Sequence, residues 1–363
     1  MAQQKERLTL CNCGYRVGCR IKFCPHCGNQ LRDDLCDAIL GRDRIRILYR
    51  IGEGGFAIVY LAECRRHGTI AVKVLKEEFA RNPLVLERWR TEVEANLRFS
   101  HANKPKTFSS GEEPLPGGKP GRIIHWLAME YVEGYSLESY LAHLERHGRV
   151  LKLDQLVDLM DQVLDVVVAA HDHGVIHRDL HPDNINIIVG PAGVVQARVL
   201  DFGISRLVDR PVASDEERMG RSRWMSPQQS AGEPVDHRTD IYNLGLLLYR
   251  MLTGRHPYVD PKTGEFSSPE QAPVPVPPSR IKGLAIPVPR RFDRITKQAL
   301  RIDPRKRQRD ARTFRGQLAS TLKPARSRSR MLWLWLVLAV AATAVLVVKL
   351  PVLWAELSNG GGG

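Results

Sequence analysis

The spacing of apolar residues changes from one part of the chain to the next. Residues 45–51 alternate between apolar and polar side chains, as a half-buried strand does, and residues 70–75 and 123–130 are apolar runs of strand length. Apolar residues recur every three or four positions in 83–98 and in 154–172, which predicts two amphipathic helices. The apolar positions of the first predicted helix are Leu84, Leu86, Trp89, Val93 and Leu97.

Residues 331–348 form a longer apolar run without a charged side chain. As a helix, its 18 residues would span about 27 Å, close to the roughly 30 Å of bilayer hydrocarbon. Trp333 lies at one end and Trp354 just beyond the other, where membrane interfaces favour aromatic residues. We therefore predict one transmembrane helix over 331–355, which acts as a single-pass anchor. A buried core helix is the alternative, and it is disfavoured because only 356–363 follows.

Positive charge is concentrated before this apolar run. Lys and Arg total 54 against 40 Asp and Glu, a formal net charge of +14, and 15 of the basic residues lie between Arg290 and Arg330. A basic segment next to an apolar helix is typical of contact with an anionic membrane surface. We therefore expect a basic juxtamembrane segment at 323–330 and no nucleic-acid partner. The excess of positive charge on this side of the helix places the rest of the chain in the cytoplasm, at the inner membrane.

Four of the 7 cysteines form two closely spaced pairs near the start of the chain, namely Cys11 with Cys13 and Cys24 with Cys27. A disulfide framework is not expected in the cytoplasm, and too few apolar residues separate the pairs to build a core. We therefore predict that residues 1–30 form a zinc ribbon whose four paired cysteines hold a structural Zn²⁺. A redox C-x-x-C site is the alternative. The stretch resembles small zinc ribbons of other bacterial proteins, which implies contact with another macromolecule, here expected to be a protein.

A glycine-rich segment follows the first predicted strand, and a lysine lies on the next one. Gly52 and Gly54 allow the backbone to approach phosphate oxygens closely, although Ala57 stands where a third glycine would complete a G-x-G-x-x-G pattern. Lys73 lies among apolar residues, where a charge is costly without a partner. Glu92 in the first predicted helix has the register to supply that partner, together with the phosphates of a nucleotide.

Three further polar residues have the spacing of a phosphoryl-transfer site. Asn184 follows Asp179 after five positions, and Asp201 comes directly after an apolar run. In such a site one carboxylate orients the substrate hydroxyl and accepts its proton, while an amide oxygen and a second carboxylate hold a metal ion. The spacing therefore predicts Asp179 in the first role and Asn184 with Asp201 in the second.

The ordered segments GEGGFAIVY, AVKVL, MEYVEG, HRDLHPDN, DFG and MSPQQ together resemble a bacterial serine/threonine protein kinase of the eukaryotic type. The resemblance covers 45–322 and implies an α+β fold, with a β-rich N-lobe, a helical C-lobe, and ATP with Mg²⁺ or Mn²⁺ between them. It implies that Asp240 braces the catalytic loop. The implied catalytic residues are Asp179, Lys73, Glu92 and His181. The implied nucleotide- and metal-binding residues are Gly52, Gly54, Val59, Lys73, Glu130, Val132, Asn184 and Asp201, with Asn184 and Asp201 on the metal.

Three positions depart from the residues that this family usually has. His181 replaces a Lys that contacts the γ-phosphate, and a neutral imidazole would supply less positive charge near pH 7. Arg221 replaces the Thr that bonds that Lys, so we expect a rebuilt local network. Gln228 replaces the Glu that pairs with Arg307, which we expect to leave Arg307 short of a partner at a cost of about 1–3 kcal/mol.

We therefore expect a membrane-anchored kinase that transfers the γ-phosphoryl group of ATP to Ser or Thr of protein substrates, and that phosphorylates itself as a dimer. Two alternatives remain: a nucleotide-binding pseudokinase scaffold, and a small-molecule phosphotransferase, which only His181 favours. Ser214 and Ser222 are the expected phosphorylation sites in the activation segment. The expected order is zinc ribbon (1–30), linker (31–44), kinase domain (45–322), basic segment (323–330), transmembrane helix (331–355) and tail (356–363).

Overall fold

The computed structural model describes residues 8–10, 16–18, 21–26, 28, 33–115, 122–190, 195–202, 222–272 and 274–322. Several sequence predictions fall outside these residues: the zinc ligands Cys11, Cys13 and Cys27, the activation-segment residues Ser214 and Arg221, and the transmembrane helix 331–355. Within the described residues, no helix has the length and apolar character needed to cross a membrane. These residues also contain no group of three or more His, Cys, Asp or Glu side chains that would hold a metal ion.

Two sheets of unequal size build the strand-rich part of the chain. In the first, the antiparallel strands β1 (Leu8–Leu10) and β2 (Arg16–Gly18) pair within the predicted ribbon. The second is antiparallel throughout, in the order β3-β4-β5-β6-β8-β7. Its strands are β3 (Ile39–Leu40), β4 (Ile45–Glu53), β5 (Ala57–Cys64), β6 (Gly68–Leu75), β7 (Thr107–Pro114) and β8 (Ile123–Glu130).

The three strands predicted from apolar patterning are confirmed, since 45–51, 70–75 and 123–130 coincide with β4, β6 and β8. Alternation places one set of side chains inside, and both Tyr60 and Val72 are fully buried. The glycine-rich segment is the turn between β4 and β5, and Lys73 lies on β6. One sheet thus carries both groups that were predicted to bind phosphate.

The segment predicted as a linker, 31–44, contributes to this sheet and its core. Leu35 and Leu40 are buried in the cluster beneath the strands, and β3 pairs with β4. The Tyr60 hydroxyl donates a hydrogen bond of 2.7 Å to Asp33. The described part of the segment, 33–44, is therefore part of the N-lobe. The sequence pattern did not predict a strand here, because β3 has only 2 residues and so shows no detectable alternation.

Helices α1 (Glu77–Ala80) and α2 (Pro83–Arg98) follow β6. Asn82 caps α2 by accepting a hydrogen bond from the amide of Leu84, and proline at the first helical position suits this start. Trp89 and Glu92 lie on the buried face. The prediction that Leu84 and Leu97 lie on the inner face of this helix is wrong, since these side chains are 66% and 50% exposed.

Helices and a small sheet build the second lobe. Its sheet has the order β11-β10-β9 and is antiparallel. The strands are β9 (Tyr135–Ser136), β10 (Ile185–Val189) and β11 (Val195–Val199). The helices are α3 (Leu137–Arg146), α4 (Leu153–Asp172), α6 (Pro227–Ser230), α7 (Arg238–Thr253), α8 (Arg291–Ala299) and α9 (Ala311–Ala319), with 3₁₀ turns η1 (Pro182–Asn184), η4 (Pro278–Arg280) and η5 (Pro304–Lys306).

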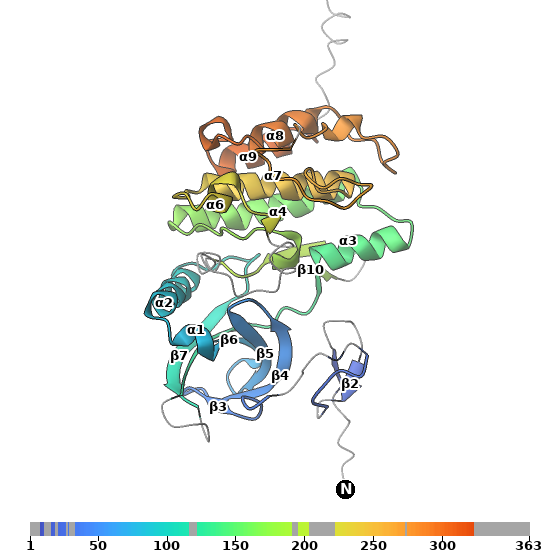
Figure 1. Cartoon of the computed structure of the whole chain (residues 1–363). Coiled ribbons are helices and arrows are strands. Elements are labelled where there is room, and N and C mark those ends of the chain that lie inside the picture. Colours follow the sequence, from blue (N-terminus) through green and yellow to red (C-terminus); the bar gives the residue numbers. More distant parts are fainter. Residues whose placement is uncertain are drawn as a thin grey trace, which may run out of the picture. The chain divides into compact units, whose positions relative to one another are not determined.

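Helix α7 lies at the centre of this lobe, between α4 and α8 (Figure 1). Nearly all of its residues are buried, which explains why it lacks a polar face. Gly245 permits close contact with α8, because a Cβ atom there would lie 2.6 Å from that of Ala299. The predicted helix 154–172 is confirmed as α4. A rigid helical core thus supports the loop between α4 and β10, which contains Asp179.

Candidate active site

Lys73 on β6 lies between two carboxylates from other elements. Its Nζ atom is 3.0 Å from Oδ1 of Asp201 and 3.8 Å from Oε1 of Glu92 on α2. Burial alone would lower the pKa of Lys73, but the carboxylates of Asp201 and Glu92 outweigh it and hold that pKa above its ordinary value. Lys73 therefore keeps its positive charge inside the protein, as an anchor for phosphate must.

Of the two carboxylates beside Lys73, that of Glu92 lies in the environment less favourable to a charge. Burial raises its pKa, and the charge of Lys73 offsets only part of that effect. Its Oε2 atom is shielded from solvent and has no hydrogen-bond partner among the described residues. Lys73 also lies nearer to Asp201 than to Glu92. The structure therefore brings Lys73 together with Glu92, as predicted, and also with Asp201, which makes the closer contact.

Asp240 on α7 holds the backbone of the catalytic loop. Its carboxylate accepts hydrogen bonds from the amides of His177 (2.9 Å) and Arg178 (2.7 Å), and it contacts His171 Nε2 at 2.8 Å. Burial alone would raise the pKa of Asp240, but the contacts from His171 and from the loop lower it below its usual range. Arg178 has a φ of 69°, which a non-glycine residue adopts only when its surroundings enforce it. The bracing role that the resemblance implied for Asp240 matches this geometry, whereas nothing in the sequence pointed to His171.

His177 connects the catalytic loop to the segment that contains Asp201. Its Nδ1 atom accepts from the amide of Asp179, so Nε2 carries the proton and donates to the carbonyl of Leu200 at 2.8 Å. Burial lowers the pKa of His177, which agrees with a neutral ring. Two contacts continue this connection: the ring packs 4.5 Å from Phe202, whose carbonyl accepts a hydrogen bond from Asn96 on α2. These contacts position Asp201 relative to both Asp179 and α2.

Asn184 is oriented by Asp179. Its Nδ2 atom donates to the main-chain oxygen of Asp179 at 2.9 Å and to Oδ2 of the same residue at 3.1 Å. The amide oxygen of Asn184 therefore points away from Asp179, and it is Oδ1 of Asp201, not Oδ2, that contacts Lys73. The amide of Leu200 donates a hydrogen bond of 2.8 Å to the carbonyl of Asn184. Because Leu200 directly precedes Asp201, this bond keeps Asn184 and Asp201 close. Carboxylate and amide oxygens of this kind fit Mg²⁺ or Mn²⁺.

His181 lies beside Asp179 and is 8% exposed. Its Nε2 atom is 3.7 Å from Oδ2 of Asp179, and its Nδ1 atom is 3.7 Å from Oδ2 of Asp183. Burial alone would lower the pKa of His181, but Asp179 and Asp183 raise it to about 9. The two carboxylates therefore favour the charged form of the ring, while Nδ1 also accepts a hydrogen bond of 3.3 Å from the amide of Asp183. The expectation of a neutral ring did not take account of these two carboxylates, because the sequence did not show that they flank it.

Three of the predicted nucleotide-binding residues, Gly52, Val59 and Lys73, lie on adjacent inner strands of the large sheet. The amide of Gly54 bonds the carbonyl of Ala57 at 2.8 Å, which closes the turn between β4 and β5. Val59 pairs with Gly52 on one side and with Lys73 on the other. A molecule that contacts Lys73 under this turn therefore also meets Val59.

Glu130 and Val132 lie where the chain passes from the large sheet to the helical lobe. Glu130 is the last residue of β8, and its amide bonds the carbonyl of Lys106 at 2.8 Å. The carbonyl of Val132 accepts a hydrogen bond of 2.9 Å from Asn186 on β10. This connection is thus attached to both lobes.

Comparison with known sequences agrees with this geometry. The family described as "Protein kinase domain" matches residues 45–312. The chain belongs to the protein kinase family. Among similar kinases, a probable serine/threonine-protein kinase of Clostridium perfringens is 33% identical over 294 residues, which are 78% of this chain and 39% of that protein. The serine/threonine-protein kinase PknB of Mycolicibacterium smegmatis is 32% identical over 280 residues, 76% of this chain and 42% of that protein.

This kinase domain is of the bacterial serine/threonine type, as the motifs predicted, and the chain spans about two fifths of the length of these relatives. Among solved structures, the kinase domain of Mycobacterium tuberculosis PknI is similar, with a TM-score of 0.60 and 25% identity over 79% of this chain and 98% of that one. A second crystal structure of that domain has a TM-score of 0.58 and 24% identity. The predicted fold, with a sheet-rich N-lobe and a helical C-lobe, is confirmed.

Arg307 has a full set of partners, contrary to the sequence-based expectation. Its guanidinium donates to the carbonyls of Arg301 (2.7 Å), Arg238 (2.9 Å) and Ile302 (2.9 Å), and to the side-chain oxygen of Gln228 (2.7 Å). It also lies 4.8 Å from the ring centre of Tyr242. Carbonyl dipoles thus replace the missing carboxylate, although burial still lowers the pKa of Arg307 to about 10.

Gln229 also holds the catalytic loop, a role that nothing in the sequence predicted. Its Nε2 atom donates a hydrogen bond of 2.7 Å to the carbonyl of Arg178. Its Oε1 atom accepts from the amide of Ser226 at 3.0 Å, within a capping box at the start of α6. The MSPQQ segment therefore contacts the catalytic loop through its second glutamine, whereas Gln228 contacts Arg307.

Proposed function

We propose that this kinase domain transfers the γ-phosphoryl group of ATP to Ser or Thr hydroxyls of protein substrates. One observation carries the proposal. Lys73 lies 3.0 Å from Asp201, directly beside a catalytic loop in which Asn184 is hydrogen-bonded to Asp179. Similarity to serine/threonine kinases over about three quarters of the chain supports the same reaction.

Each charged group has a separate task in this transfer. Lys73 binds the α- and β-phosphates, while Asp201 and Asn184 present oxygens to Mg²⁺, which neutralises phosphate charge when it is bound. Asp179 orients the substrate hydroxyl for in-line attack and accepts its proton. The new oxygen–phosphorus bond forms as the bond between the γ-phosphorus and ADP breaks.

The test compares the full chain with its Asp179→Asn variant, using labelled ATP and a serine peptide. We expect the variant to lose about 10²–10⁴-fold in rate, the usual contribution of a positioned general base. Asp158→Asn is the matched control, because Asp158 is exposed on α4 and far from the chemistry. Equal labelling by wild type and Asp179→Asn, or no labelling by either, contradicts the proposal and favours a pseudokinase scaffold. Label on a small metabolite but never on protein favours small-molecule phosphotransfer.

Autophosphorylation within a dimer is a further part of the proposal, which mixing active and Asp179→Asn chains tests directly.

We also propose that residues 331–355 anchor the kinase in the cytoplasmic membrane as a single-pass helix, with the kinase domain in the cytoplasm. The uncharged run 331–348 and the basic residues before it support this. The full chain is expected in the membrane fraction and to resist an alkaline wash, whereas a chain ending at Arg330 is expected in the supernatant. Membrane retention of the shorter chain contradicts the anchor and assigns attachment to the basic segment.

A structural Zn²⁺ held by Cys11, Cys13, Cys24 and Cys27 is the third part of the proposal, with a protein as the partner of the ribbon. The two cysteine pairs support it. Metal analysis of the purified chain is expected to find about one equivalent of zinc, since four thiolates complete one tetrahedral site. The double substitution Cys24→Ser with Cys27→Ser is expected to abolish it, whereas Cys64→Ser, at the end of β5, is expected to retain it. Purified wild type without zinc contradicts this assignment.

A further inference from the structure

A cavity of about 550 Å³ lies beside the catalytic loop. His181, Asp183 and Asn184 of that loop line one side, and Arg223 and Trp224 line another. His181 also lies 3.7 Å from Asp179. A peptide whose hydroxyl is held at Asp179 therefore places its neighbouring side chains over this cavity. The volume is in the range of ordinary ligand pockets.

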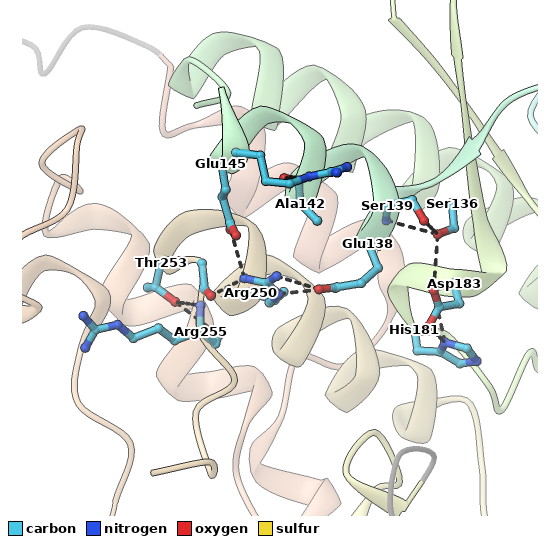
Figure 2. A network of polar contacts seen from close by, with 12 residues as sticks. Ser136, Glu138, Ser139, Ala142, Glu145, His181, Asp183, Arg250, Thr253 and Arg255 are labelled. Carbon is cyan, nitrogen blue, oxygen red and sulfur yellow. Dashed lines mark hydrogen bonds and ion pairs between the residues drawn. The ribbon is translucent and has the colours of Figure 1, made fainter. Parts of the chain in front are cut away.

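The first acidic group on the cavity wall is already neutralised within the chain. Glu138 on α3 accepts hydrogen bonds from Arg250 of α7, at 2.6 Å from Nη2 and 3.3 Å from Nε. Figure 2 shows Arg250 between Glu138 and Glu145, where it also bonds the carbonyl of Gly254. The side chain of Arg250 is 11% exposed. Glu138 is thus a partner of Arg250 rather than a free acceptor for a basic substrate residue.

Asp183, the second acid on the wall, also has neighbours within the chain. Its Oδ1 atom accepts a hydrogen bond of 3.2 Å from Ser136, and its Oδ2 atom lies 3.7 Å from Nδ1 of His181 (Figure 2). His181 and Arg250 therefore each face one of the two acids that line the cavity. This arrangement reduces the negative potential that would attract a lysine or arginine.

Arg223 is the third basic residue that lines the cavity, after His181 and Arg250. Among the described residues no ion pair of Arg223 occurs, and its Nε atom is shielded from solvent without a hydrogen-bond partner. A shielded guanidinium nitrogen without an acceptor is costly, and an incoming carboxylate or phosphate would satisfy it. The neighbouring His256 adds no competing charge, because burial, together with the charges of Arg223 and Arg250, lowers its pKa to about 4.

We propose that this cavity binds an anionic side chain of the substrate close to the phosphorylated residue, with Arg223 as the residue that determines this specificity. The proposal rests on the kinase activity proposed above. The expected substrates carry Asp or Glu beside the target Ser or Thr, and a phosphorylated residue presents the same anionic chemistry with more charge.

The test measures kcat/KM of the full chain on serine peptides that differ at one flanking position, up to three residues on either side of the serine. Each position carries Glu, phosphoserine, Gln or Lys. At one or more positions the Glu peptide is expected to exceed the Lys peptide by about tenfold or more, since a guanidinium–carboxylate pair contributes about 1.5–3 kcal/mol. A larger preference for phosphoserine over Glu identifies a substrate that is phosphorylated beforehand, and equal preference identifies an acidic one.

Two variants connect the preference to Arg223. Arg223→Gln is expected to make the Glu and Lys peptides equal, and Arg223→Glu to favour Lys. Arg291→Glu, an equal charge change at an exposed residue of α8, is expected to leave the preference unchanged. Thermal unfolding of each variant verifies its fold, and Arg223→Gln retains the test where Arg223→Glu is unstable.

The possible results separate this inference from the activity on which it rests. Wild type that phosphorylates Glu, Gln and Lys peptides equally, or prefers Lys, overturns the acidic specificity and leaves the kinase activity standing. Retention of the Glu preference in both Arg223 variants overturns the role of Arg223. Absence of labelling on every peptide and on the chain itself overturns the proposed function, and the specificity with it.

Discussion

Gln228 accepts a hydrogen bond of 2.7 Å from Nη2 of Arg307 and donates one of 3.0 Å to the carbonyl of Ile302. One amide side chain therefore joins the segment after the active site to the loop before α9. A neutral side chain at position 228 is compatible with the charge of Arg307, because three main-chain carbonyls also accept hydrogen bonds from the guanidinium.

Gln228→Ala is expected to lower the free energy of unfolding by about 1–3 kcal/mol, because it leaves a buried guanidinium with one acceptor fewer. Urea denaturation followed by tryptophan fluorescence measures the change. Gln271→Ala, at an exposed glutamine, is the control and is expected to have little effect. A Gln228→Ala midpoint equal to that of wild type would show that the carbonyls alone suffice.

Substitutions at His181 test whether the charge of its ring matters. Asp179 and Asp183 raise the pKa of His181 to about 9, which favours a charged ring beside Asp179. His181→Gln keeps a hydrogen-bond donor but loses the charge, and we expect kcat to fall about 10–100-fold, somewhat less than the loss of a transition-state donor elsewhere. His181→Lys is expected to retain most activity. Steady-state peptide phosphorylation measures both, and a fully active His181→Gln would contradict this role.

Lys104 predicts how stability changes at alkaline pH. It is 3% exposed, it donates to the carbonyl of Asn96 at 3.0 Å, and burial lowers its pKa from 10.5 to about 8. The unfolded chain therefore binds more protons than the native chain between pH 8 and 10.5, so this residue makes stability rise with pH in that interval. The same residue costs stability below pH 8, where both states are protonated.

Lys104→Met is expected to remove this rise, which urea midpoints measured at intervals from pH 7 to 10.5 would show. Lys106→Met is the control, because Lys106 is exposed two residues further along the chain. If both variants follow the pH profile of wild type, then Lys104 does not titrate in this range in the native protein.

Asp240→Asn tests the brace beneath the catalytic loop. The substitution places an amide donor where the amides of His177 and Arg178 each need an acceptor, so one of these bonds is lost. We expect kcat to fall about 10²-fold, as often follows from misplacing a catalytic group, and the free energy of unfolding to fall by about 1–3 kcal/mol. Peptide phosphorylation and thermal unfolding measure the two effects. A stable variant with unchanged kcat would show that the loop keeps its conformation without Asp240.

Sequence reasoning located the site through residues whose spacing is tied to chemistry. Lys73, Glu92, Asp179 and Asp201 were identified because a buried charge requires a partner and a transferred phosphoryl group requires fixed carboxylates. It did not identify His171, Asn96 or Gln229. These residues act through contacts between elements far apart in the chain, and nothing in their local sequence marks such contacts.

The sequence by itself determined the family, the lobes and the main reacting groups, because apolar periodicity and motif spacing are local properties of the chain. The tertiary structure alone decided the electrostatics. It placed Asp179 and Asp183 around His181, carbonyls around Arg307, and Arg250 against Glu138, and it left Arg223 on the cavity wall without an acidic partner among the described residues. Charge and pKa depend on burial and on neighbours within a few ångströms, and folding sets both.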